Sequence, residues 1–189
     1  MQVRIVRRVI FQNQESRQRM FKKRLLLLPA LLATLAFGAS AQDLTGKYTR
    51  TPTGYLMVLR NGDDVIAHLE RLAAVEQIPS ASIVGIGFMR EAKFGFYDFS
   101  RKVFDPKTFK DVELANLTGS IAWKEGKPSI HAHGIVTDGT FIGAGGHLLG
   151  LTVGTGSCEI TVMLHPHRLE RFVDPAIGAN VLGLHPGAK

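Results

Sequence analysis

Three histidines in the second half of this 189-residue chain have the residue types and spacing of a metal site. His131 and His133 are two residues apart in a run that reads as a strand, so both side chains point to the same face. His147 follows fourteen residues after His133, beyond the glycine-rich run 143–146, and a hairpin of that length can return it beside the pair. Three imidazoles on one patch are typical of a divalent-metal site with one coordination position open.

The same pattern is compatible with three hydrogen-bonded histidines on a sheet surface, and the residues alone leave both interpretations open. His165 and His167 repeat the spacing, but Pro166 interrupts a strand there, so we expect these two in a loop and away from a metal. Imidazole ligands favour a late first-row divalent ion, with zinc as the default, over calcium or magnesium. Because ligation requires neutral rings, the pattern predicts that affinity falls as the pH drops through about 6.5.

Two further residues are candidates for chemistry beside such a metal. A metal with an open position polarises a carbonyl or lowers the pKa of bound water, and a general acid or base is then needed nearby. Glu159, on the strand predicted after His147, is the candidate carboxylate; its alternative is an ordinary exposed strand residue. Arg60, at the end of the first predicted strand, could hold an anionic substrate or serve only the structure.

The elements that must position these residues follow from the apolar periodicity. Residues 55–60 predict a strand, and Asn61–Asp64 predict a turn and a helix start. Apolar residues between Val65 and Ala73 recur on one face of a helix that ends before Pro79. Seven strand-like runs follow, over 81–89, 93–99, 111–114, 117–123, 129–136, 147–153 and 158–164. One helix followed by many strands predicts an α+β domain around a mostly antiparallel sheet.

The first 41 residues read as a leader that is removed on export. From Met20, which we expect to be the true start, a basic segment (22–24) precedes an apolar run (25–37) and Ala39-Ser40-Ala41. This order is typical of a secretory signal peptide over residues 20–41, cleaved before Gln42. The apolar run has 13 residues, fewer than the ~18–20 that span a bilayer, so we expect no stable membrane anchor. The sequence therefore predicts a periplasmic or secreted protein.

After the leader we expect a flexible lead-in over 42–54, a single domain over 55–175 and a C-terminal tail over 176–189. The net charge of +7 belongs to the leader, because the remaining chain carries 15 basic and 15 acidic residues. A neutral domain lacks the basic face from which nucleic-acid binding draws most of its affinity. The one cysteine, Cys158, lies in an apolar run and is predicted to be a buried strand thiol.

Several segments of the chain match the pattern of a known family. They are Gly62–Val65 with Leu69, Ile83–Gly87, Leu117–Ile121, Gly126–His133, Gly145–Leu148, Glu159 and the ending Arg171–Pro175. On these segments the stretch from about Tyr55 to Leu164 resembles the plant and prokaryote conserved (PPC) domain, known from plant AT-hook proteins.

This resemblance implies an α+β fold, a homotrimer and a fold similar to that of acetolactate decarboxylase, whose members hold zinc on an H-x-H pair and a third histidine. By position, His131, His133 and His147 match those ligands. Members of the family are often described as DNA-binding, although residues 42–189 contain no Arg-Gly-Arg-Pro hook. The sequence thus predicts an exported metal-site protein, either a metal-dependent enzyme or a small-molecule binder of unknown ligand. DNA binding is the alternative.

Overall fold

The computed structural model describes residues 43–184. The predicted leader, its cleavage site and residues 185–189 lie outside the described residues. Within the described part the chain forms eight strands and one helix. In chain order these are β1 (Tyr48–Thr51), β2 (Gly54–Arg60), α2 (Val65–Val75), β3 (Ser80–Asp98), β4 (Val103–Lys124), β5 (Lys127–Thr137), β6 (Gly143–His165), β7 (Glu170–Asp174) and β8 (Ala179–Gly183). No helix in this part is long and apolar enough to cross a membrane.

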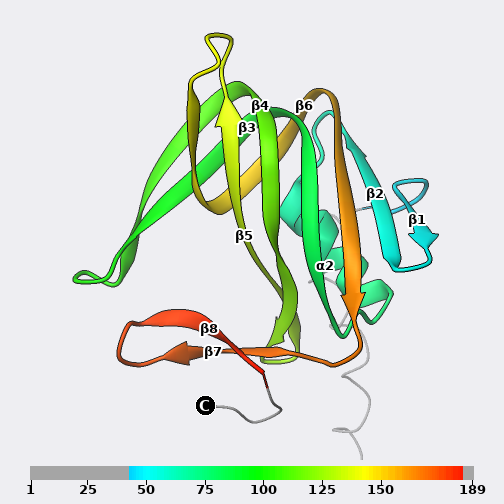
Figure 1. Ribbon diagram of the computed structural model, residues 1–189, viewed down its shortest axis with the longest axis vertical. Coiled ribbons are helices and arrows are strands. Elements are labelled where there is room, and N and C mark those ends of the chain that lie inside the picture. Colours follow the sequence, from blue (N-terminus) through cyan, green and yellow to red (C-terminus); the bar gives the residue numbers. More distant parts are fainter. Residues whose placement is uncertain (1–42, 185–189) are drawn as a thin grey trace, which may run out of the picture. The chain divides into compact units, whose positions relative to one another are not determined.

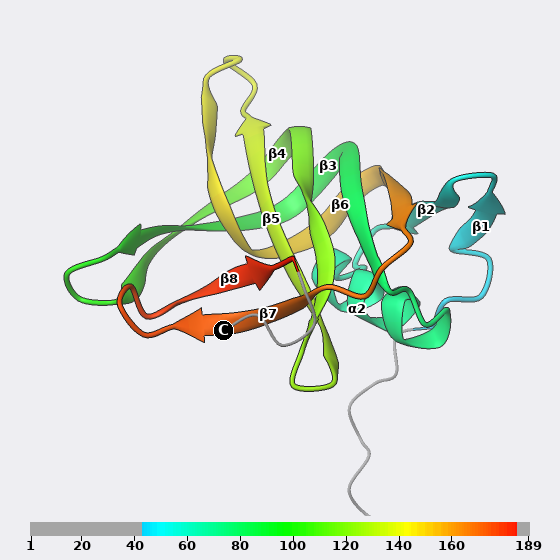
Figure 2. The same ribbon diagram turned by 60° about the horizontal axis from the view of Figure 1, so that its bottom comes forward.

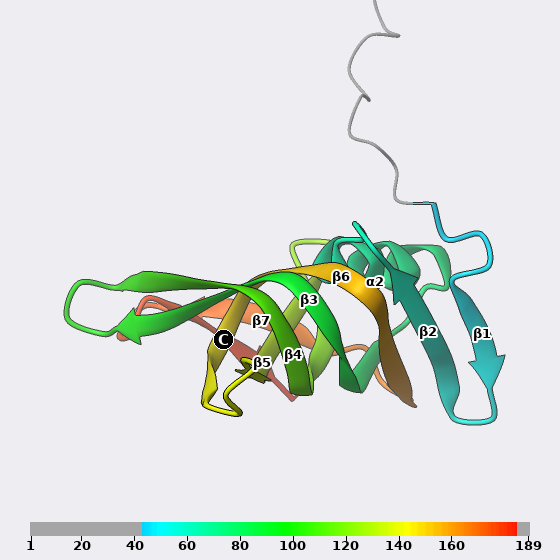
Figure 3. The same ribbon diagram turned by 90° about the horizontal axis from the view of Figure 1, so that it is seen from above.

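All eight strands belong to one sheet (Figure 1). Every pairing is antiparallel except a single parallel contact, which joins Trp123 of β4 to Glu170 of β7. Helix α2 packs against β5 and β6 on one side of this sheet (Figure 3). The α+β class, with one main helix and a mostly antiparallel sheet, is thereby confirmed.

Helix α2 lies where the apolar periodicity predicts it. Asp64 caps its first turn, because the carboxylate accepts the backbone N–H of Ala67 at 2.9 Å. The helix ends at Val75, four residues before Pro79. Its buried face consists of Val65, His68, Leu69, Leu72 and Ala73. This face covers the core side of the sheet, so the helix is held chiefly by tertiary packing.

Four strands of the sheet form a closed circuit. β3 pairs with β4 and β6, and β5 also pairs with β4 and β6. The circuit closes because β6 changes neighbours: Gly143–His147 pair with β5, whereas the strand from His147 onward pairs with β3. β6 thus crosses from the β5 hairpin to a place between β2 and β3 (Figure 2). His147 lies at the residue where this change occurs.

The strands are longer than the sequence patterns predict, because runs that read as separate strands join. Asp105-Pro106, which fall between the predicted strands 93–99 and 111–114, lie inside β4, where Pro106 pairs with Gly95 of β3. β5 pairs with β4 only from Glu113 onward, so β4 has one sheet neighbour at Pro106 and the missing N–H is tolerated. Gly154–Gly156, which fall between the predicted strands 147–153 and 158–164, lie inside β6 at a register shift opposite β3.

The ends of the domain differ from the expected boundaries. Residues 42–54, expected to be a flexible lead-in, contain β1, whose Tyr48 pairs with Met57 of β2. The hydroxyl of Tyr48 donates to the Glu76 carboxylate at 2.6 Å, which ties this hairpin to the end of α2. The expected tail over 176–189 contains β8, which pairs with β7 and lengthens the domain beyond residue 175. Cys158 is fully buried, as predicted.

Candidate metal centre

The three histidines singled out in the sequence lie together. His133 of β5 and His147 of β6 are direct partners in the antiparallel ladder, and His131 precedes His133 by two residues on the same face. Their ring centroids are 5.0 to 5.4 Å apart. One nitrogen of each ring can be chosen so that all three lie within 4.8 Å of one another. The hairpin predicted between His133 and His147 is therefore present, and it brings His147 beside the other two histidines.

Glycines let the strands behind the histidines approach closely. A Cβ added at Gly145 would lie 2.2 Å from the carbonyl oxygen of Gly134, inside the β5–β6 ladder. A Cβ added at Gly119 of β4 would lie 2.3 Å from the carbonyl oxygen of His131. Both distances are far below van der Waals contact, so a side chain at either position would displace β5 and the histidines on it.

Two neighbours hold the imidazole rings. Phe104 of β4 stacks on His147, with ring centroids 4.6 Å apart and an angle of 21° between the planes. Nη1 of Arg171, on β7, lies 3.5 Å from Nδ1 of His131, while its Nη2 donates to Oγ of Ser120 at 2.7 Å. A guanidinium only donates, so Nη1 can bond to Nδ1 of His131 only when that nitrogen carries the lone pair of the ring. At 3.5 Å the contact is weak, and a metal bound at Nδ1 would replace it.

The surroundings favour neutral histidines. Burial, followed by the charges of His131, His133 and Arg171, lowers the pKa of His147 from 6.5 to about 4. Burial, followed by the charges of Arg171 and His133, also lowers the pKa of His131. Both rings are therefore unprotonated at neutral pH, which is the form that binds metals. Because the pKa values of His131 and His147 are lowered, metal affinity should fall less steeply near pH 6.5 than it would for three histidines of ordinary pKa.

The histidines lie in a cavity of about 670 Å³, a size typical of small-molecule sites. β5 and β6 line the cavity around the histidines, and the remaining walls come from two hairpins. These are the outer part of the β3–β4 hairpin, residues 91–110 (the β3–β4 arm), and the β7–β8 hairpin. The Tyr97 hydroxyl joins them by donating to the Ile177 carbonyl at 3.1 Å. The aromatic wall consists of Phe96, Tyr97, Phe99 and Phe104. The cationic groups in the lining are Arg171 and Lys124, and none of the described lining residues is Asp or Glu.

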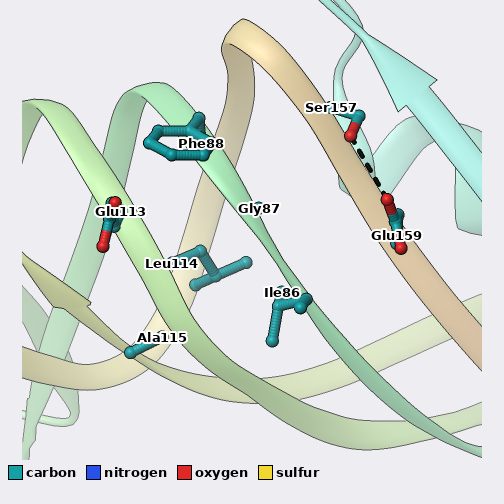
Figure 4. A pocket seen from close by; sticks show the side chains of 8 residues that line it. All are labelled: Ile86, Gly87, Phe88, Glu113, Leu114, Ala115, Ser157 and Glu159. Atoms are coloured by element: carbon teal, nitrogen blue, oxygen red, sulfur yellow. Dashed lines mark hydrogen bonds between the residues drawn. The ribbon is translucent and has the colours of Figure 1, made fainter.

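Glu159 and Arg60 do not line this cavity. Glu159 is the twelfth residue after His147 on β6, a contour of roughly 40 Å in an extended strand. Its side chain lies at a second, smaller pocket of about 350 Å³ beside Ile86, Phe88 and Glu113 (Figure 4). Arg60 is exposed at the end of β2, opposite Ser157. Within one chain, neither residue is placed to act at the histidines.

His165 and His167 lie outside the cavity, as expected. His165 is the last residue of β6 and not part of a loop, and its Nε2 lies 3.0 Å from Oγ of Ser82. His167 is exposed beyond the strand end. Arg171, in contrast, was not singled out for this site by the sequence patterns. Its position depends on the parallel contact between Trp123 and Glu170, which no local periodicity indicates.

The donor set suits a transition metal. Three imidazoles without a carboxylate match the preference of zinc and its neighbours in the first row, whereas magnesium and calcium prefer oxygen ligands. His131, His133 and His147 would hold the ion, with the cavity on its open side.

Residues 46–165 match the Plants and Prokaryotes Conserved (PCC) domain. A search of curated proteins found no match.

Three solved structures are similar to this chain. A putative DNA-binding protein from Ralstonia eutropha JMP134 is 77% identical, with a TM-score of 0.74 over 76% of this chain and 100% of that chain. A metal-containing protein from Archaeoglobus fulgidus is 28% identical, with a TM-score of 0.61 over 71% of this chain and 96% of that one. A plant- and prokaryote-conserved (PPC) protein from Pyrococcus horikoshii is 26% identical, with a TM-score of 0.63 over 76% and 100% of the two chains.

Proposed function

We propose the function of this chain from its family, since it belongs to the Plants and Prokaryotes Conserved (PCC) domain family. The proposed function is that the protein binds a divalent metal and presents this metal to a small molecule. His131, His133 and His147 are the proposed ligands, and zinc is the proposed ion. The observation that carries the proposal is the convergence of three ligand nitrogens within 4.8 Å of one another at a cavity of about 670 Å³. The metal-containing relative from Archaeoglobus fulgidus supports it.

The cavity supports ligand binding better than carboxylate-assisted catalysis. A bound metal supplies a Lewis acid that polarises an oxygen ligand or acidifies a bound water. The aromatic wall offers apolar surface to one side of the ligand, and Arg171 and Lys124 attract negative charge. No described lining residue carries a carboxylate that could act as general base, so we propose binding at the metal as the function of the single chain.

Elemental analysis tests this proposal directly. The protein, expressed with ample zinc, nickel and iron and then dialysed, should carry about one divalent ion per chain. The variant His131→Ala, prepared in parallel, should carry much less while keeping its circular dichroism spectrum. Metal-free wild-type protein would overturn the proposed function.

We further propose that the protein acts outside the cytoplasm, in the periplasm or after secretion. The support is the signal-peptide pattern over residues 20–41, which ends at Ala41. Mass mapping of the N-terminus of protein from the cell envelope should find Gln42. A start that retained residues 22–37 would contradict export by this route.

A homotrimer is the assembly that we propose. On the side of β3 away from the core, Ile86 and Phe88 are 57% and 50% exposed, and Val84 continues the same row. Glu159 of β6 lies beside Ile86 in the ladder and interrupts this apolar face. Exposed apolar patches of this kind are typical of contact surfaces between chains. We therefore infer that this face, together with the small pocket at Glu159, is covered by another copy.

DNA binding is the second candidate function, because the Ralstonia relative at 77% identity is described as a putative DNA-binding protein. The densest basic stretch lies on the β3–β4 arm, between Arg101 and Lys110. Arg101 is already paired with Asp98 at 2.7 Å and with Asp105. Since residues 42–189 carry no net charge, the proposal for nucleic acid is much less supported than the one for the metal.

A further inference from the structure

We propose that Arg171 binds the carboxylate of a small organic acid whose apolar body lies against the aromatic wall of the histidine cavity. This inference rests on the proposed function, because it names the class of ligand that the metal site would take. It concerns a residue on β7, outside residues 46–165 but within the ending Arg171–Pro175 that resembles the family's own.

The first step is the burial of an unpaired charge. Arg171 is only 6% exposed, yet no carboxylate among residues 43–184 forms an ion pair with it. Of the five N–H donors of its guanidinium, one meets Oγ of Ser120 and one meets Nδ1 of His131. Its Nε has no hydrogen-bond partner among the described residues. A buried cation with unmet donors is costly unless an anion pairs with it.

The second step is the sign of the charge around the cavity. Lys124 also lines it, with Nζ donating to Oδ1 of Asn180 at 2.8 Å, and no described lining residue is acidic. A divalent ion on the three histidines would add further positive charge a few ångströms from Arg171. The cavity as a whole therefore selects an anion over a neutral or cationic ligand.

The third step distinguishes an organic acid from an inorganic anion. Phe96 and Phe99, which line the cavity, are 79% and 63% exposed and so offer apolar surface to a ligand. The volume of about 670 Å³ far exceeds that of a phosphate ion. A guanidinium presents two parallel N–H groups that match the two oxygens of a carboxylate. A ligand with a carboxylate at one end and an apolar body satisfies both parts of the cavity.

Benzoate is a suitable probe, because it has the carboxylate and an apolar ring. Isothermal titration with benzoate would be carried out on zinc-loaded and metal-free protein, with benzamide and inorganic phosphate as comparison ligands. We expect benzoate to bind more tightly than either. Arg171→Gln should weaken benzoate binding about ten- to hundredfold, which corresponds to the loss of charged hydrogen bonds. Arg171→Lys keeps the charge but loses the pair of parallel N–H donors. Its affinity for benzoate should therefore lie between those of the wild type and Arg171→Gln.

Arg168→Gln is the matched control, since Arg168 stacks over Trp123 at 3.9 Å and pairs with Glu170 away from the cavity. It should bind benzoate as the wild type does. Thermal melts and metal analysis of every variant show whether fold and zinc content are kept. Unchanged benzoate affinity in folded Arg171→Gln would overturn the inference, and so would benzamide or phosphate binding as tightly as benzoate to the wild type.

The two proposals can fail separately. If the wild type takes up no metal, the proposed function fails, and the metal-free titration still decides whether Arg171 recognises the carboxylate. If metal binds but benzoate binding does not depend on Arg171, the metal site stands and the ligand class is wrong. If Arg171→Gln does not fold, two other measurements decide whether Arg171 recognises the carboxylate. These are the benzoate affinity of Arg171→Lys and the comparison of benzoate with benzamide on the wild type.

Discussion

His133 and His147 are direct partners across two antiparallel strands, with their ring centroids 5.2 Å apart. At His147, β6 also leaves β5 and begins to pair with β3, where Gly95 is its partner. The site is thus built at the junction of three strands in a closed circuit. Backbone ladders on both sides restrain His133 and His147, and His131 pairs with Ser120 of β4, which is the rigid support that a preorganised metal site needs.

The first prediction separates this cluster from the other histidines. Replacing His131, His133 or His147 by alanine should remove most of the metal, because each supplies one of three ligands, while the fold persists on its own core. His165→Ala and His167→Ala, the matched controls, should retain it. Plasma mass spectrometry of the dialysed variants gives the metal content. Equal losses from His165→Ala and His147→Ala would mean that the ligands are wrongly assigned.

Stability of the metal-free protein should depend on pH through His147. An unfolded histidine takes up a proton near pH 6.5, whereas His147 in the fold stays neutral down to about pH 4. Between these values the unfolded state binds more protons, so stability should fall as the pH is lowered through this window. Thermal melts at pH 7 and pH 4.5 check this. The variant His147→Asn should show a smaller difference between the two melting temperatures, and an unchanged difference would contradict the prediction.

Phe104 should position the imidazole ring of the metal ligand His147 without itself touching the metal. Its stack on His147 restricts the imidazole, and an aromatic pair is worth about 0.5–1.5 kcal/mol, so Phe104→Leu should weaken metal affinity about two- to tenfold. Competition with a chromophoric chelator measures the change. Phe99→Leu is the control, because Phe99 packs on Tyr97, 5.0 Å between centroids, and makes no aromatic contact with the histidines. Equal effects of the two substitutions would argue against a positioning role.

Assembly can be tested at the exposed face of β3. Light scattering at micromolar concentration should give about three times the mass of one processed chain. Phe88→Asp should shift the protein toward smaller species, because it would place a charge in the apolar contact surface. Phe141→Asp, at the tip of the β5–β6 hairpin, offers a control of equal chemistry at a site 86% exposed. A wild-type monomer would refute the trimer, and an equal shift by both variants would place the contact elsewhere.

For nucleic acid we expect no sequence-selective binding by residues 42–189. With 15 charges of each sign, any weak retention in a gel-shift titration should disappear at physiological salt, where the Debye length is about 8 Å. Arg101→Gln, on the arm with the most basic residues, should change nothing at that salt. Tight and selective binding under these conditions would restore DNA binding as the function.

Much of the local structure could be predicted from the sequence, because short-range backbone geometry imposes it. The period of the apolar residues from Val65 to Ala73 places them on one helix face, and the helix was found there. The two-residue repeat of a strand puts His131 and His133 on one face whatever the rest of the fold does. The glycine-rich connection to His147 allowed a hairpin that returns it to the pair.

Other features depend on segments far apart in the chain, and only the tertiary structure decided them. Arg171 reaches His131 because β7 docks against the end of β4, a contact that no periodicity in either strand encodes. Glu159 shares a strand with His147, yet the length of β6 and its change of partner place them at different pockets. Residue types and spacing therefore determined which groups could bind a metal. The pairing and twist of the sheet decided which charges surround them, because those neighbours are set by long-range packing.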